Sequence, residues 1–243
     1  MGQERNAQIP AWDTRAEIMK LDLHVHSTYS ADSLATPKDI VRVARKRGLD
    51  GVAVTDHDTI MGGLETKKAC SDRGFIVIVG EEISTEKGDI IGLFLEKEIK
   101  SRLCADVIKE IHSQGGIAIL PHPLKHHELD ESLLAGIDAV EIFNSRTSND
   151  KNSKALMLAK KYSKPMVAGS DAHFCIEIGR AMTIIEDPDI KKALLSGTSR
   201  TEGVHTHSSF EGLSQVIKFC RTKKYTMIIR MISSVVRKRI SQD

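Results

Sequence analysis

Long hydrophobic runs are missing from this sequence of 243 residues. Its uninterrupted apolar stretches span only a few residues, whereas a helix that crosses a bilayer needs about 20. The first 20 residues carry charges and a proline but lack the apolar core that a secretory signal requires. We therefore expect no transmembrane segment and a cytoplasmic location.

Cysteine is scarce and dispersed. The four cysteines are Cys70, Cys104, Cys175 and Cys220, and no two of them form a C-x-x-C pair. This spacing excludes a zinc knuckle and a small disulfide scaffold, so we expect reduced thiols. With 40% hydrophobic and 28% charged residues, the composition is that of a soluble globular chain with a core of its own.

Acidic residues are absent from residues 218–239, although this segment holds many of the basic ones. The sequence therefore combines an acidic body with a basic tail. Apolar residues recur at helical spacing in that tail, which predicts a basic amphipathic helix; they are Ile228, Met231, Ile232 and Val235. Such a helix either covers the body with its apolar face or binds an anionic partner, a nucleic acid or a membrane surface.

Short apolar segments alternate with amphipathic ones, as expected of parallel βα units. Predicted strands cover 19–25, 51–55, 75–79, 89–95, 117–120, 139–143 and 166–168. Predicted helices cover 37–47, 62–73, 101–114, 149–162 and a short segment near residue 131. Thr36 and Pro37 suit the cap and first position of the first helix. Six or seven such units favour an α/β barrel or an open doubly wound sheet.

Polar clusters follow the predicted strands at their carboxyl ends, where parallel α/β folds place their chemistry. The clusters are His24 with His26, Asp56-His57-Asp58, Glu81-Glu82, His122 between two prolines, Glu141 with Asn144, and Asp171 with His173. Each has an ordinary alternative, since histidines pack or face solvent and Asp residues cap turns. Their joint occurrence at one rim predicts a multinuclear metal site.

The motifs LDLHVHSTYSADS, AVTDHDT, VGEEIS, LPHP, VEIFN and AGSDAH follow one another in this order. Over residues 20–185 the chain thereby resembles the PHP (polymerase and histidinol phosphatase) family. The resemblance implies a distorted (β/α)7 barrel of the PHP type, with up to three divalent metals at its rim and phosphoester hydrolysis as its activity. We expect an N-terminal extension at 1–18, the barrel at 19–200, and a connector with the basic helical extension at 201–243.

Matched motif by motif, the resemblance implies the metal ligands His24, His26, Asp32, His57, Glu81, His122, Asn144, Asp171 and His173. Glu81 is expected to bridge two metals, and Asp32, His57 and His173 to hold a third. The ligand from the 139–143 strand is either Glu141 or Asn144. We favour Asn144, since Glu141 lies at an odd offset from it and strand residues at odd offsets face opposite sides.

Imidazole and carboxylate ligands without thiolate suit manganese, zinc or iron, and two or three such ions are expected. A hydroxide shared by two metals then attacks phosphorus while the third metal holds the phosphate. Arg146 and Arg180 are the candidates for stabilising the developing charge, although both could be ordinary surface arginines. Asp56 and Asp58 are candidates for orienting His57.

The expected substrate is a nucleotide, sugar or amino-alcohol phosphate, or the 5′ end of an oligonucleotide. No large insertion separates Glu81 from His122, so we expect an open site. The alternative function is a non-catalytic module in which the metals stabilise a scaffold that binds nucleic acid or a protein partner.

Overall fold

The computed structural model describes residues 18–125, 127–228 and 230–231. Nearly all of the expected N-terminal extension at 1–18 lies outside these residues. The same holds for the predicted tail-helix positions Ile232 and Val235 and for the basic residues 237–239. None of the helices in the described part of the chain is both long and apolar enough to cross a membrane.

One sheet organises the described residues, with strand order β7-β6-β5-β4-β3-β2-β1-β8-β9. The strands are β1 (Met19–Val25), β2 (Gly51–His57), β3 (Ile76–Thr85), β4 (Gly88–Leu93), β5 (Ile117–Leu120), β6 (Ala139–Asn144), β7 (Met166–Gly169), β8 (Ala181–Ile185) and β9 (Arg200–Gly203). Strands β1, β2 and β3 run parallel, as do β5, β6 and β7, whereas β4, β8 and β9 pair antiparallel to their neighbours.

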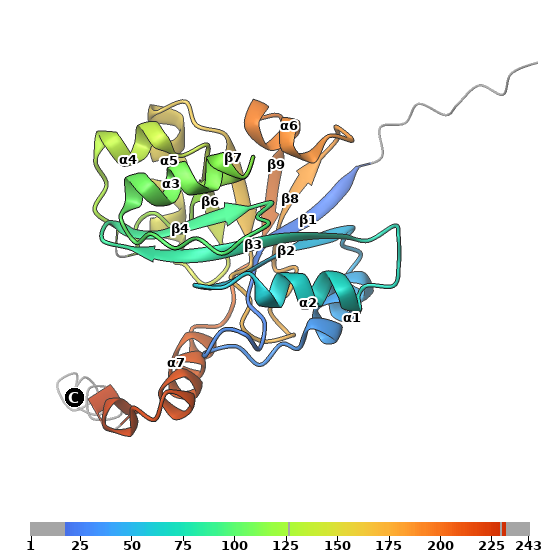
Figure 1. Ribbon diagram of the computed structural model, residues 1–243. Helices are drawn as coiled ribbons and strands as arrows, with labels where there is room; N and C mark the ends of the chain where they lie inside the picture. The colour runs from blue at the N-terminus through green and yellow to red at the C-terminus, as the bar shows by residue number, and fades with distance from the viewer. Residues whose placement is uncertain (1–17, 126, 229, 232–243) are drawn as a thin grey trace, which may run out of the picture.

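The sheet curls until β7 comes beside β1, and this nearly closes a barrel (Figure 1). The backbone N–H of His26 donates to the carbonyl of Ala172, just beyond β7, at 2.8 Å. Gly169 permits this approach, because a Cβ there would lie 2.3 Å from the Cβ of His24. The predicted α/β barrel is confirmed. It departs from a regular parallel barrel because β4 and β8 run antiparallel to their neighbours.

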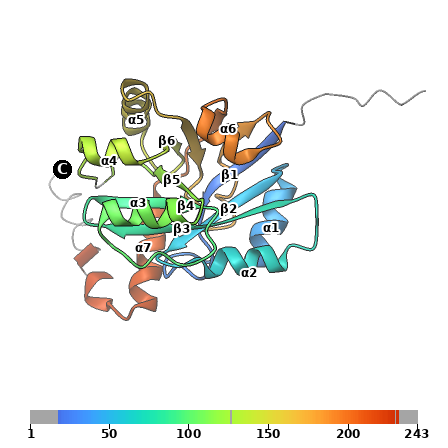
Figure 2. The same ribbon diagram turned by 45° about the horizontal axis from the view of Figure 1, so that its top comes forward.

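The helices are α1 (Pro37–Lys46), α2 (Met61–Ala69), α3 (Cys104–Ser113), α4 (Glu131–Gly136), α5 (Asn149–Lys161), α6 (Ile190–Ser196) and α7 (Ser209–Arg221). Helices α1 and α2 pack together on one side of the sheet, and α3 lies beside α4 on another, as Figures 1 and 2 show. The first helix begins as predicted, because Thr36 accepts from the N–H of Asp39 and Pro37 needs no partner.

A bulge in β1 turns the two histidines of this strand toward the barrel interior. Before the bulge, Leu21 and Leu23 pack in an apolar cluster built mostly from barrel strands. After it, Val25 packs with the cluster on the α1 side, so the odd-numbered positions have changed face. His24 and His26 therefore share the inner side, and such re-aiming is typical of bulges next to functional sites.

Helix α7 lies at the end of the molecule opposite to α6, across the carboxyl ends of the parallel strands (Figure 1). Arg221 at its last turn donates through Nη1 to the carbonyls of Ser30 and Ser33, at 3.1 and 2.8 Å. Lys218 Nζ lies 3.3 Å from Asp32 Oδ2. The start of the basic tail thus contacts the barrel, while binding of an anionic partner by the tail stays a prediction.

Candidate metal centre

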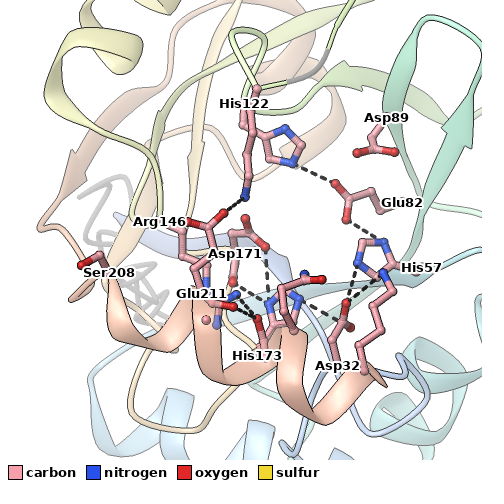
Figure 3. Close-up of a pocket in the computed structure, with 15 residues that line it drawn as sticks. Asp32, His57, Glu82, Asp89, His122, Arg146, Asp171, His173, Ser208 and Glu211 are labelled. Atoms are coloured by element: carbon pink, nitrogen blue, oxygen red, sulfur yellow. Dashed lines mark hydrogen bonds and ion pairs between the residues drawn. The ribbon is translucent and has the colours of Figure 1, made fainter. Parts of the chain in front are cut away.

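The carboxyl ends of β1, β2, β3, β5 and β7 bring their polar side chains to one mouth of the barrel (Figure 3). The residues that meet there are His24, His26, Asp32, His57, Glu82, His122, Asp171 and His173. All are buried except His57, whose side chain is 27% exposed. Ionisable groups so deep in a protein need partners, or a bound ion, to offset the cost of leaving water.

Glu82 occupies the middle of this mouth. One carboxylate oxygen, Oε1, lies 3.0 Å from Nε2 of His122. The other, Oε2, lies 3.3 Å from Nε2 of His26 and 3.1 Å from Nδ1 of His57. The two oxygens therefore face different imidazoles, Oε1 that of His122 and Oε2 those of His26 and His57.

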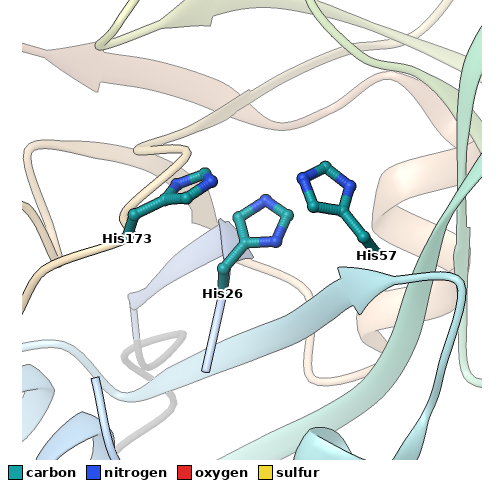
Figure 4. A group of neighbouring side chains, drawn as sticks. All are labelled: His26, His57 and His173. Carbon is teal, nitrogen blue, oxygen red and sulfur yellow. The ribbon is translucent and has the colours of Figure 1, made fainter. Parts of the chain in front are cut away.

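His24 and His26 point their Nε2 atoms at each other across 3.1 Å. Asp171 Oδ1 lies 3.6 Å from the first of these nitrogens and 3.4 Å from the second. The ring of His26 lies between those of His57 and His173, with centroids 4.6 and 4.2 Å from its own (Figure 4). The imidazoles thus form one connected cluster.

Three overlapping groups within the described residues place their ligand atoms within 4.8 Å of one another. The groups are His24 with Glu82 and His122, His24 with His26 and Asp171, and His26 with His57 and His173. Asp32 lies beside the third group, 3.4 Å from His57 and 3.5 Å from His173. Its Oδ1 atom has no hydrogen-bond partner. These nitrogen and oxygen donors fit divalent cations.

The electrostatics of the cluster also match a cation site. Burial by itself would lower the pKa of His26, but hydrogen bonds to Asp171 and Glu82 outweigh it and raise this pKa to about 9. Burial would raise the pKa of Glu82, yet the charges of His24 and His57 hold it well below its usual range. Carboxylates that remain ionised in a buried site attract positive charge, from protons or from metal ions.

A second layer of contacts fixes the imidazoles. His24 Nδ1 lies 3.0 Å from Glu141 Oε1, and His26 Nδ1 lies 3.1 Å from Ser30 Oγ, which in turn donates to Asp56 at 2.7 Å. In each ring the Nδ1 atom is hydrogen-bonded outside the cluster and the Nε2 atom points into it, as in many metal sites. Glu141 is therefore an orienting residue in this structure.

Glu81, which was predicted to bridge two metals, lies outside the cluster, and its neighbour Glu82 faces the histidines. Adjacent residues of a strand face opposite sides, so only one of the two glutamates can point inward. Glu81 Oε2 accepts from the N–H of Ile99 at 3.0 Å, away from the histidines. Burial raises the pKa of Glu81 to about 7.

A bulge in β6 removes the reason for preferring Asn144 over Glu141 as the residue that faces the cluster. The register slips between Glu141 and Phe143, so that the odd offset no longer separates the faces. Asn144 Nδ2 donates to Glu141 Oε2 at 2.9 Å and to Asp171 Oδ2 at 3.3 Å, while its Oδ1 accepts from the N–H of Arg146. Asn144 borders the cluster and contacts Asp171, and its role as a metal ligand stays a prediction.

Asp56 is buried and supports the loop after β1. Its carboxylate accepts from the N–H and hydroxyl of both Ser27 and Ser30. It reaches His57 only through Ser30 Oγ, which accepts from the N–H of His57 at 3.0 Å. The expected orientation of His57 by Asp56 is thus an indirect contact through the backbone.

Asp58 and Arg180 turn away from the cluster, contrary to expectation. Asp58 has a φ of 55°, and its half-exposed carboxylate lies 3.3 Å from Arg102 Nη2. Arg180 donates to the carbonyl of His205 at 2.9 Å and does not line the cavity at the mouth. Strand β2 ends at His57, so the turn that follows sets the direction of Asp58, whereas Arg180 lies in the connection that leads into β8.

The cluster forms the floor of a cavity of about 550 Å³. Arg146, Lys125 and Lys218 supply positive charge to its walls. Arg146 binds Glu177 through two nitrogens, at 2.8 and 2.7 Å, and donates to Ser214 of α7. Helix α7 forms one wall of the cavity (Figure 3). Lys125 was not predicted as a site residue, because it lies in the loop five residues beyond the end of β5.

Several known proteins are similar to this chain in sequence. Two uncharacterised proteins of Methanocaldococcus jannaschii are 43% identical over 141 residues and 37% identical over 186 residues. The first alignment covers 52% of this chain and 82% of that relative. The second covers 72% of this chain and 73% of that relative. A 5′-3′ exoribonuclease of Haemophilus influenzae is 25% identical over 263 aligned positions, which cover 69% of this chain and 96% of that protein.

A solved structure shares the fold. It is a two-domain protein of Bacteroides vulgatus containing a predicted PHP-like metal-dependent phosphoesterase, with a TM-score of 0.68 and 21% identity over 84% of this chain and 70% of that one. The PHP domain model matches residues 22–234, which include every residue of the cluster. The chain therefore belongs to the PHP domain family.

Proposed function

We propose that the protein is a metal-dependent phosphoesterase. The observation that carries the proposal is the set of three overlapping ligand groups, which forms the floor of a cavity with cationic walls. We propose that two or three divalent cations would be held by His24, His26, Asp32, His57, Glu82, His122, Asp171 and His173. Manganese, zinc and iron all suit this donor set.

The residues of the chain have different roles at this site. Bound divalent cations supply Lewis-acid activation of the phosphate and of water. Glu141 and Ser30 hold the rings of His24 and His26 in a fixed orientation. Lys125 and Arg146 face the cavity and offset the negative charge that develops on the phosphate oxygens. Helix α7 limits the access of water from one side.

The proposed substrates are a nucleotide, a sugar phosphate or an amino-alcohol phosphate, or the 5′ end of an oligonucleotide. The relative named as a 5′-3′ exoribonuclease supports the last of these. The four cysteines are free thiols, in keeping with a reducing compartment, and we propose the cytoplasm.

The test combines metal content with turnover. We expect purified protein to hold two or three divalent ions per chain and to hydrolyse p-nitrophenyl phosphate. Glu82→Gln should lose metal and lower kcat/KM by about 100-fold or more, since it removes a ligand shared between groups. His112→Ala, which changes a histidine outside the cluster, should match the wild type. Full metal content without turnover of any phosphate ester would favour a non-catalytic module.

A further inference from the structure

The three cationic side chains of the cavity wall, Arg146, Lys125 and Lys218, differ in the carboxylate that each contacts. Arg146 and Lys125 pair with glutamates outside the proposed ligand set. Lys218, by contrast, places its Nζ atom 3.3 Å from Oδ2 of Asp32, which is a proposed metal ligand. Any metal ion held by Asp32 therefore shares that carboxylate with an ammonium group.

An imidazole and an ammonium group act differently on a cation that approaches Asp32. His57 and His173 lie 3.4 and 3.5 Å from the carboxylate of Asp32, and each ring can coordinate the cation through an unprotonated nitrogen. Lys218 has three N–H donors, no free electron pair at neutral pH and a full positive charge, so it repels the cation. The cation must therefore displace Lys218 from Asp32 or bind against its repulsion.

Helix α7 keeps Lys218 next to Asp32. In the last turn of this helix, Arg221 donates to the carbonyls of Ser30 and Ser33, which lie on either side of Asp32 in the chain. The backbone at Lys218 is thus tied to the loop that carries Asp32. The side chain of Lys218 is 40% exposed, so its ammonium group can turn into water, whereas that of Asp32 is 1% exposed. Lys218 therefore competes with a cation for Asp32 but does not block it.

The other two ligand groups have no such competitor. Their carboxylates are Glu82 and Asp171. Within the described residues, the ion-pair partners of both carboxylates are histidines, and no lysine or arginine is among them. A cation bound there displaces no ammonium group. The cation positions of the cluster should therefore differ in affinity.

We propose that Lys218 competes with a divalent cation for Asp32 and thereby weakens the cation position that Asp32 shares with the third ligand group. This position is the one that His57 and His173 complete. The inference rests on the proposed metal-dependent function, and it says which position stays empty when the protein holds two ions rather than three. It also gives α7 a role in metal occupancy.

The experiment titrates chelator-treated protein with manganese at pH 7.5 and follows binding by calorimetry and by the electron paramagnetic resonance of free Mn²⁺. We expect the wild type to bind two ions tightly and a third more weakly. Lys218→Met keeps most of the length of the side chain and removes its charge. The Kd of the weak position should then fall about tenfold, and the tight positions should change by less. Lys218→Arg keeps the charge and should retain a weak third position.

Two other lysines separate this effect from a general change in charge. Lys125→Met removes the same charge from the same cavity and should not act preferentially on the weak position. Lys224→Met removes it from the exposed segment after α7 and should leave every Kd unchanged. Thermal unfolding of each chelator-treated variant checks that it is folded. Three equal affinities in the wild type, an unchanged third position in Lys218→Met, or equal tightening of that position in Lys125→Met overturns the inference.

The same samples distinguish the two proposals. If the wild-type protein binds no manganese and hydrolyses no phosphomonoester, the proposed function itself fails. If it binds manganese and hydrolyses monoesters while Lys218→Met retains the wild-type affinities, only the role of Lys218 is wrong.

Discussion

At the scale of single residues, the sequence alone could not predict which of the two adjacent glutamates of β3 faces the histidines. The motif identifies a carboxylate at this strand end, but both Glu81 and Glu82 are buried, as are the residues on either side of them. No alternation of apolar and polar residues therefore indicates which one faces the histidines. The answer depends on the register of β3 against β2, where Glu82 pairs with His57.

Glu81 is a buried carboxyl that should weaken the fold as pH rises. Burial is the main cause of its raised pKa, and the N–H of Ile99 and the charge of Arg102 oppose it, while the negative charges of Glu98 and Asp58 raise the pKa further. An unfolded glutamate ionises near pH 4.5 and the folded one near 7, so stability should fall as pH rises between these values. The loss should be about 3 kcal/mol at most.

Glu81→Gln removes this titration and keeps the shape of the side chain. We expect metal-free Glu81→Gln to be more stable than wild type at pH 8, with a much smaller difference at pH 5, as measured by urea unfolding. The exposed Glu96→Gln serves as the charge control. An equal difference at both pH values would show that Glu81 does not titrate in this range.

At the scale of elements, the apolar pattern predicted the strands and helices from β1 to β7. The strands at 19–25 and 117–120 match at both ends, and the helices starting at Pro37 and Asn149 begin where expected. The elements β8, α6, β9 and α7 were not predicted. Strand β9 has the sequence RTEG without apolar alternation, and α7 turns polar residues toward the cavity. Apolar periodicity carries little information about either element.

Arg221 couples α7 to the loop that carries Asp32, since it donates to the carbonyls of Ser30 and Ser33. Hydrogen bonds from a charged donor are worth about 1.5–3 kcal/mol each. Arg221→Ala should therefore loosen both segments, with faster hydrogen exchange in residues 27–35 and 209–221. We expect KM to rise about three- to tenfold while kcat changes less. The exposed Lys224→Ala is the matched control, and unchanged exchange in Arg221→Ala would show that α7 is held by other contacts.

At the scale of the whole molecule, the metal centre and the barrel depend on each other. Its proposed ligands come from positions 24 to 173, so the centre exists only when the barrel closes between β1 and β7. Bulges in β1 and β6, which no sequence pattern marked, turn their side chains inward. Because the unfolded chain cannot assemble these ligands, metal binding should add directly to the free energy of unfolding.

Manganese should therefore raise the melting temperature. At a free concentration 100 times its Kd, a ligand that binds only the folded chain adds about 2.7 kcal/mol. For a chain of this size each kcal/mol corresponds to about 2–4 °C, so we expect a shift of about 5–10 °C in scanning calorimetry against protein treated with a chelator. His26→Ala, which removes a residue shared by two ligand groups, should lose most of this shift, whereas His112→Ala should retain it. Equal melting temperatures with manganese and with chelator would show that manganese does not stabilise the fold, and would contradict the assignment of the ligands.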